Sequence, residues 1–223
     1  DYEETLSNVA WLAVPEIADW CVVDLLDARG IRRRVAVAHT DRDKLALAEE
    51  LRRNEPQDEE SGVMRVARSG VAELYSDITD QMLVEGARDE RHLELLREVG
   101  LRSAMITPMR ARGRTLGVMT VVTAESLRRY DQSDLEFAEQ LAARAAIAVD
   151  NARLATARRE IAETLQRSLL PDAVPAIGGW EIAAMYRAAK ASDEVEVGGD
   201  FYDFVPTPAG WLVLLGDVTG RGV

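Results

Sequence analysis

The sequence predicts an α+β fold in which helices cover an antiparallel sheet, an α/β/α arrangement. Two pairs of strand-like segments, each joined by a short turn, are separated by helical segments and flanked by helices at both ends. Strands joined by tight turns pair antiparallel, and amphipathic helices need a sheet face to cover, so this order predicts one sheet with helices on it. The chain has 223 residues, 47% of them apolar and 30% charged, which is enough for more than one folded unit.

The N-terminal elements are a helix and the first pair of strands. Residues 2–14 predict a helix because apolar side chains recur every three or four positions and Pro15 follows them. Residues 18–27 are rich in aromatic and β-branched side chains, and residues 32–39 alternate between apolar and polar ones. A turn at Gly30 separates these segments, so we expect them to form a hairpin.

Helices are expected between the two strand pairs. Asp41 predicts the N-cap of a helix that ends near Arg53. Three shorter helices are predicted at residues 62–69, 80–85 and 89–99. Gly100 is expected to cap the last of them at its C-terminus. The apolar side chains expected to face inward on that helix are Leu93, Leu96 and Val99.

The second pair of strands is predicted at residues 103–110 and 116–123, with a turn at Ala111-Arg-Gly113. Two further motifs follow it, Tyr130-Asp-Gln-Ser-Asp-Leu-Glu-Phe-Ala138 and Ala148-Val-Asp-Asn-Ala-Arg-Leu154. This hairpin and the two motifs together resemble the C-terminal half of a GAF domain. The resemblance implies a GAF-type antiparallel sheet with flanking helices and a sensory role.

By this resemblance residues 1–156 form a GAF sensor domain, with a small-molecule pocket between the sheet and residues 41–100. GAF domains bind cyclic nucleotides, haem, bilins or no ligand, so the fold leaves the ligand unknown. His39 and His92 are the two histidines, and they do not form a close pair at metal-ligand spacing. Cys21 falls in a predicted core strand, where a buried structural thiol is favoured over a bilin attachment or redox site.

A long connecting helix is predicted over residues 132–170, which contain neither Pro nor Gly. At 1.5 Å per residue it would be on the order of 55 to 60 Å long, more than one domain needs. The stripe expected to pack on the sheet is Ala138, Leu141, Ala145, Ala148, Ala152 and Ala155. A second stripe consists of Ile147, Leu154, Ile161 and Leu165, with Asn151 and Arg158 as polar members.

The second stripe of this helix has two interpretations. It is either the outer side of a loosely amphipathic exit helix or the seam of a parallel coiled coil. An exposed stripe of branched residues needs a partner, so we favour a homodimer through residues 132–170, with Asn151 helping to fix its register.

Residues 171–223 begin a different unit, because Pro171 and Pro175 end the helix. Its predicted strands are residues 180–188, 198–205 and 211–217. Asp200 opens one strand of the hairpin and Asp217 closes the other, so both carboxylates are expected at the same end. Two such carboxylates beside glycines suit half of a Mg²⁺ or Mn²⁺ site.

Three motifs in this part of the chain occur in a fixed order. They are Leu165-Gln-Arg-Ser-Leu-Leu-Pro171, Val197-Gly-Gly-Asp-Phe-Tyr-Asp203 and Gly216-Asp-Val-Thr-Gly-Arg-Gly222. Together they resemble the opening of a bacterial SpoIIE-type phosphatase domain of the metal-dependent PPM superfamily. The resemblance implies that residues 171–223 start a PPM-type β-sandwich and that the domain is truncated at Val223.

The resemblance also implies roles for individual residues. Asp200 and Asp217 would ligate metal, with Asp217 bridging two ions and the carbonyl of Val218 adding an oxygen. Asp203 and Gly199 would lie just behind these ligands, although an exposed strand aspartate is an equal alternative for Asp203. Two Mn²⁺ or Mg²⁺ ions would activate a water for in-line attack on phosphoserine or phosphothreonine.

The family's usual substrate is a phosphorylated anti-sigma-factor antagonist, whose dephosphorylation an upstream sensor regulates. We expect the chain to have little phosphatase activity by itself, because later aspartates complete the centre in this family. The alternatives are a non-catalytic GAF sensing or dimerisation module, or a sensor for another effector. The sequence disfavours a cyclase, because Phe-Tyr follows Gly198-Gly-Asp200, and a histidine kinase, because no His follows His92.

Charge and cysteine content restrict the partners and the compartment. The net charge of −12 disfavours nucleic acid and anionic membranes as partners. No apolar run approaches the roughly 20 residues that a membrane helix needs. A single cysteine cannot form an internal disulfide, so we expect a reducing, cytoplasmic location.

Overall fold

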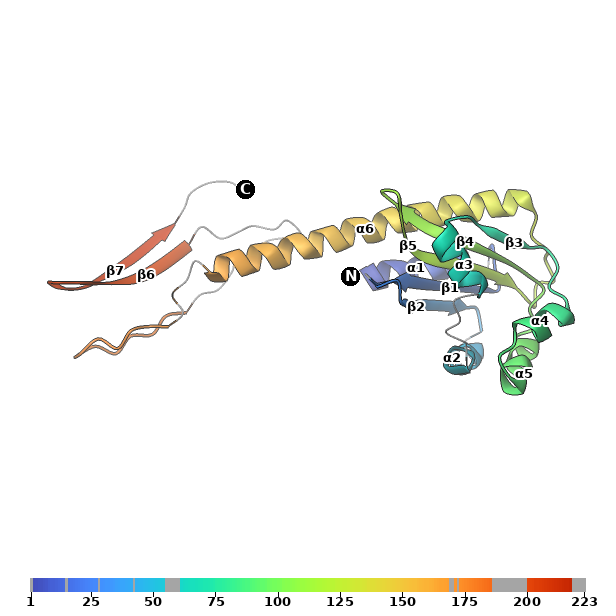
Figure 1. Ribbon diagram of the computed structural model, residues 1–223, viewed down its shortest axis with the longest axis horizontal. Helices are drawn as coiled ribbons and strands as arrows, with labels where there is room; N and C mark the ends of the chain where they lie inside the picture. Colours follow the sequence, from blue (N-terminus) through green and yellow to red (C-terminus); the bar gives the residue numbers. More distant parts are fainter. Residues whose placement is uncertain are drawn as a thin grey trace. The chain divides into compact units, whose positions relative to one another are not determined.

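The computed structural model describes residues 2–14, 16–27, 29–41, 43–54, 61–168, 171, 173–185 and 200–217. The chain divides into two compact units, Asp1–Ala152 and Arg153–Val223. Figure 1 labels the elements of both units, and each unit is described by itself.

The first unit contains one antiparallel sheet of five strands in the order β2-β1-β5-β4-β3. The strands are β1 (Trp20–Leu26), β2 (Arg32–His39), β3 (Glu73–Tyr75), β4 (Ser103–Ala111) and β5 (Arg114–Thr123). The two predicted hairpins meet where β1 pairs with β5, and Val22 lies opposite Thr120 in that pairing. In β4 the residue opposite Thr120 is Ile106. Thr120 therefore occupies the middle of the sheet.

One face of the sheet is covered by α1 (Tyr2–Ala13) and the first part of α6 (Gln132–Ser168), as Figure 1 shows. Leu6, Ala10 and Ala13 of α1 are fully buried, as their spacing predicts. The strands contribute Cys21, Val23, Leu25, Met105, Met119 and Val121 to the same cluster. Because successive strand residues face opposite sides of a sheet, the residues between these face the other layer.

The other face is covered by α2 (Lys44–Asn54), α3 (Gly62–Ser69) and α5 (Glu90–Val99), and α4 (Asp80–Gly86) lies against α5. Helix α3 lies against β4 and β5, and α2 contacts α5. The hydroxyl of Ser61 caps α3 by accepting from the Met64 N–H, and Gly100 ends α5 with φ of 73°. The predicted α+β fold with helices on both faces is therefore present.

Three details of this helical layer differ from the sequence prediction. Helix α2 begins at Lys44 because the Asp41 carboxylate accepts from the Asp43 N–H, 3.0 Å away, in a turn before the helix. In α5 the buried residues are His92, Leu95 and Val99, whereas Leu93 and Leu96 are half-buried. Strand β3 has three residues, too few for a periodic pattern, and was not expected.

Helix α6 runs without a break through 37 residues. Among its residues whose side chains are described, the buried ones are Leu135, Ala138, Ala142, Ala145, Ala146, Val149 and Asp150. The predicted inner stripe is confirmed at Ala138 and Ala145, which are buried, and at Leu141, which packs half-buried against the core. It is wrong at its C-terminal end, where Ala155 is exposed. On the second stripe Ile147 is 55% and Ile161 60% exposed, and Leu154 is half-buried.

The second unit contains a hairpin of β6 (Asp200–Thr207) and β7 (Gly210–Asp217). Residues 180–185 are not a strand, contrary to the prediction, and the rest of that predicted strand lies outside the described residues. The Trp180 N–H donates to the Ile177 carbonyl at 3.0 Å, which closes a turn where the strand was expected to begin. Gly216 allows the ring of Phe201 to cross it, because a Cβ there would lie 2.4 Å from that ring.

Candidate functional site

The sheet face covered by α2, α3 and α5 holds two polar groups among apolar neighbours. The hydroxyl of Thr120 and the indole N–H of Trp20 are buried, and among the described residues neither has a hydrogen-bond partner. Thr120 is opposite Val22 on the adjacent strand β1, and Trp20 is two residues before Val22. The two groups are therefore diagonal neighbours on one face. An unpaired buried polar group is rare in folded proteins, so this pair is a candidate ligand contact.

Two apolar clusters flank the hydroxyl of Thr120. On one side Val122 joins Trp20 and Ala104, together with half-buried side chains of α2. On the other side Val118 joins Ile106 and Val66 of α3. The hydroxyl thus lies at the junction of two apolar clusters. A ligand group there would be shielded from water and recognised by few polar contacts.

A buried ion pair fixes β1 and β2 beside this face. The Asp24 carboxylate is 2% exposed and accepts from Arg34 Nε at 3.0 Å and Nη2 at 3.3 Å. A register shift between Val23 and Asp24 accommodates the pair. Strand β5 approaches closely because Gly117 has no side chain, and a Cβ there would lie 2.3 Å from the Asp24 carbonyl oxygen. The Asp24 carboxylate is thus held by Arg34 of the neighbouring strand.

His39 lies at the end of the same face, buried against Trp20 with the ring centroids 4.2 Å apart. Its Nδ1 accepts from the Asp41 N–H at 2.9 Å, and its Nε2 lies 3.5 Å from Glu125 Oε2. Lys44 pairs with the same glutamate. Burial is the main cause that lowers the pKa of His39. A neutral ring with its proton on Nε2 fits both contacts.

Cys21 and His92, the other two residues considered as attachment or ligand sites, have structural environments. Burial raises the pKa of Cys21 to about 12, and its side chain lies in the opposite layer, among the residues that α1 and α6 cover. His92 Nδ1 accepts from the Arg88 N–H at 3.1 Å at the start of α5. The structural roles favoured for these residues by the sequence agree with these contacts.

The candidate metal ligands lie on the hairpin of the second unit. The Cα atoms of Asp200 and Asp217 are partners in the β6–β7 register, at the end away from the turn. Asp203 is exposed, and its carboxylate accepts from the Phe204 N–H at 2.8 Å. Gly199 and Val218 lie outside the described residues. Within the described part of the chain, no group of three or more His, Cys, Asp or Glu side chains is placed to hold a metal ion.

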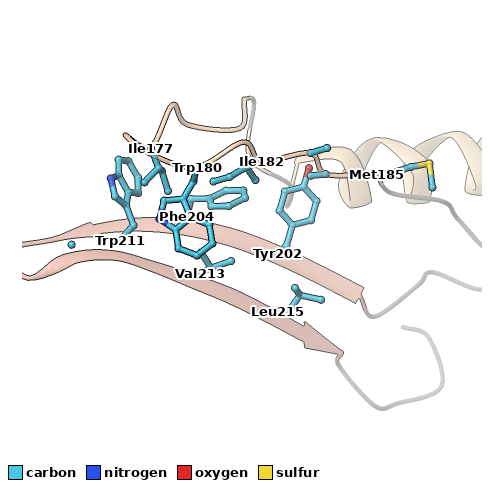
Figure 2. A pocket seen from close by; sticks show the side chains of 12 residues that line it. Ile177, Trp180, Ile182, Met185, Tyr202, Phe204, Trp211, Val213 and Leu215 are labelled. Carbon is cyan, nitrogen blue, oxygen red and sulfur yellow. The ribbon is translucent and has the colours of Figure 1, made fainter.

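An apolar groove of about 680 Å³ lies between residues 177–185 and the hairpin. Figure 2 shows Ile177, Trp180 and Ile182 on one side and Phe204 and Trp211 on the other. None of its lining residues is charged, so the groove is chemically distinct from a metal centre. Trp180 and Leu215 are 76% and 87% exposed, so this apolar surface is largely uncovered within the described residues.

A family model described as GAF domain matches residues 1–149, about two thirds of the chain. The chain belongs to the GAF domain family. No curated protein matches it. Solved structures of low sequence identity also share this fold, and they are evidence for the fold alone.

One similar structure is the GAF domain of a phosphoenolpyruvate-protein phosphotransferase from Coxiella burnetii. It is 18% identical with a TM-score of 0.54, covering 70% of this chain and 87% of that one. Another is a GAF domain/HD domain protein from Geobacter sulfurreducens, 16% identical with a TM-score of 0.52, covering 69% of this chain and 95% of that one.

No described helix is both long and apolar enough to cross a membrane.

The GAF match confirms the sensor family predicted from the second hairpin and the two motifs after it. The sequence did not single out Trp20 and Thr120 as site residues, because each falls within an apolar strand pattern. Thr120 was the one detectable signal, since it interrupts the apolar run Val118-Met-Thr-Val-Val122. Only the pairing of β1 with β5 brings it beside Trp20.

Proposed function

We propose that this GAF domain is a signalling sensor for a small ligand that carries a hydrogen-bond acceptor. The observation that supports the proposal is the pair of unpartnered buried groups, Trp20 Nε1 and Thr120 Oγ1. The indole N–H can only donate, whereas the hydroxyl can donate or accept. A carbonyl or carboxylate oxygen beside them would satisfy both donors. The apolar clusters around Thr120 would accommodate the rest of the ligand.

The ligand proposal is tested by native mass spectrometry of the purified chain, combined with a thermal-shift screen of small metabolites. A bound species in the wild type should be lost in Trp20→Phe, which keeps an aromatic side chain but removes the N–H from this site. Trp211→Phe is the matched control, because Trp211 lies in the second unit. Retention of the ligand by Trp20→Phe, or its loss from both variants, would contradict the assignment.

A second candidate function is that of a metal-dependent serine/threonine phosphatase, regulated by the sensor. Its support is the register of the hairpin, which pairs Asp200 with Asp217, the two residues that match the family's metal ligands. Two adjacent aspartates at a sheet end fit part of a Mn²⁺ or Mg²⁺ centre but not a complete ligand set. Bound metal would supply an activated water and offset the charge of the phosphoryl group. The alternative remains a non-catalytic GAF sensing module.

The phosphatase proposal is tested with the chain extended past Val223, assayed with Mn²⁺ on a phosphoserine protein. A phosphorylated anti-sigma-factor antagonist is the substrate class that the resemblance suggests. Asp217→Asn should abolish metal-dependent hydrolysis, whereas Asp43→Asn in the GAF domain should leave it unchanged. An active Asp217→Asn form would overturn the ligand assignment, and an extended wild type without activity would favour the non-catalytic module.

We also propose that the chain forms a homodimer through helix α6. The support is the exposure of Ile147 and Ile161, which are fourteen residues apart and lie on one stripe with Leu154. With Asn151 and Arg158 between them, this stripe has the a/d spacing of a two-stranded coiled coil. A dimer would give the sensor and the second unit a common helix pair through which a change of state could pass.

A further inference from the structure

The turn between β4 and β5 breaks a local rule. Arg112 and Gly113 connect the strands, and the residues that flank them, Ala111 and Arg114, are paired. Both turn residues have positive φ, 48° for Arg112 and 77° for Gly113. A two-residue turn with two positive φ values is of type I′, in which Asn or Asp is preferred before the Gly. Arginine at this position is locally unfavourable.

An ion pair explains why arginine occurs there. Arg112 Nε lies 2.7 Å from the Oδ2 of Asp150 in α6. The Asp150 side chain is 7% exposed, whereas that of Arg112 is 65% exposed. A nearly buried carboxylate needs a hydrogen-bonded cation more than an exposed one does, because little water reaches it. Asn at position 112 would suit the turn but could not neutralise this charge.

Asp150 occupies a special place on α6. Among the described residues of this helix it is the last buried one, and the half-buried and exposed positions from Asn151 onward follow it. Its neighbour Val149 belongs to the same core cluster as Ala111, the residue before Arg112. The ion pair therefore joins the turn to the helix at the point where the helix leaves the GAF domain.

We propose that Arg112 is a positioning residue that fastens the β4–β5 turn to Asp150 and thereby fixes where α6 leaves the domain. The turn links the two strands that carry Ile106 and Thr120, so a shift of the ligand face would reach α6 through this pair. The transmission of a shift from the ligand face to α6 rests on the proposed sensor function. The pairing of Arg112 with Asp150 as a fixed point of the helix does not.

Hydrogen exchange of the full chain, without added ligand, tests the fastening. In Arg112→Asn the amides of residues 147–154 should exchange about fivefold faster or more, as expected for the loss of one ion pair. The amides of β4 and β5 should be unchanged or slower, because Asn suits the type I′ turn. Arg114→Asn, one step past the turn at an exposed arginine, is the matched control and should leave α6 unchanged.

Asp150→Asn provides an independent check of the same pair. It should accelerate exchange in the same segment of α6, and the double variant with Arg112→Asn should add little to either single one. Unchanged exchange in α6, or an equal increase across β4, β5 and α6, would overturn the proposal. Because no ligand is present, failure here is distinct from failure of the sensor or the phosphatase proposal.

Discussion

Thr120 and Thr107 are both central strand threonines, but their hydroxyls differ. The Thr107 hydroxyl, on β4 and fully buried, donates to the Met119 carbonyl at 3.1 Å, whereas the Thr120 hydroxyl has no partner among the described residues. Thr120→Val should therefore stabilise the ligand-free chain by about 1 kcal/mol, since it removes an unsatisfied group at nearly constant volume. Urea unfolding monitored by circular dichroism measures the change.

Thr107→Val is the matched control for this prediction. It removes the same hydroxyl from a satisfied position, so it should destabilise the chain by about 1 kcal/mol. If Thr120→Val destabilised the chain as much as Thr107→Val does, the hydroxyl of Thr120 would have an internal partner. The Thr120 hydroxyl would then not be a ligand contact.

His39 should make the stability of the GAF domain sensitive to mild acid. Burial lowers its folded pKa below the ordinary value of 6.5, so the unfolded ring takes up a proton at a pH where the folded ring does not. The unfolding free energy should therefore fall as the pH is lowered through about 6.5, and level off below the folded pKa. The charged groups around the ring are Asp19, Asp41, Lys44 and Glu125.

His39→Gln tests this pH dependence. The variant should lose less stability than the wild type between pH 7 and pH 5, in urea midpoints measured at both values. The carboxylates near the ring are common to both proteins, so the difference between variant and wild type reports on the histidine. An identical loss in variant and wild type would show that another group causes the acid sensitivity.

At the scale of elements, β1 and β2 depend on the ion pair between Asp24 and Arg34. Arg34→Met should destabilise the chain by about 2–3 kcal/mol, because it removes the closer cation of a buried carboxylate and leaves Arg32 at 3.9 Å. The double variant Asp24→Leu/Arg34→Met should lose less than the single one. Thermal unfolding of the wild type, the single variant and the double variant measures these differences. A double variant less stable than the single one would contradict the prediction.

Most elements of the GAF domain could be predicted because their spacing and end signals agree. Gly62–Ser69 is the clearest case, with its bounds found as predicted and Ser61 and Gly70 at its ends. The details that failed depend on tertiary contacts. His92 takes a buried position in α5 because the Arg88 N–H bonds its ring, and apolar spacing cannot reveal that. The expected strand from Trp180 failed because strand-like composition does not provide a pairing partner.

The candidate site was less predictable than the fold. The register of β6 and β7 agrees with the expectation that Asp200 and Asp217 lie at the same end of a hairpin, because a hairpin fixes the pairing of its own residues. The contact between Trp20 and the Thr120 region could not be expected, because almost a hundred residues separate them and only the sheet order joins them. The Asp24 ion pair was missed because a bulge sets its geometry.

At the scale of the whole molecule, the proposed dimer predicts that the chain sediments with the mass of two copies. Sedimentation velocity at micromolar concentration should show a dimer for the wild type and a monomer for Ile161→Asp, because a charge in a coiled-coil seam is strongly unfavourable. Thr156→Asp is the matched control, since Thr156 is exposed on α6 but off the stripe. A monomeric wild type, or dissociation by both substitutions, would contradict this seam.

The burial of Cys21 has a practical consequence for such experiments. A thiol with a pKa of about 12, inside the core, reacts negligibly with maleimides or disulfide reagents near neutral pH. The natural sequence therefore needs no cysteine replacement before labelling. A probe or an oxidative cross-link placed through Ile161→Cys would report on that position alone, and a spin label there could follow the exit helix while candidate ligands are added.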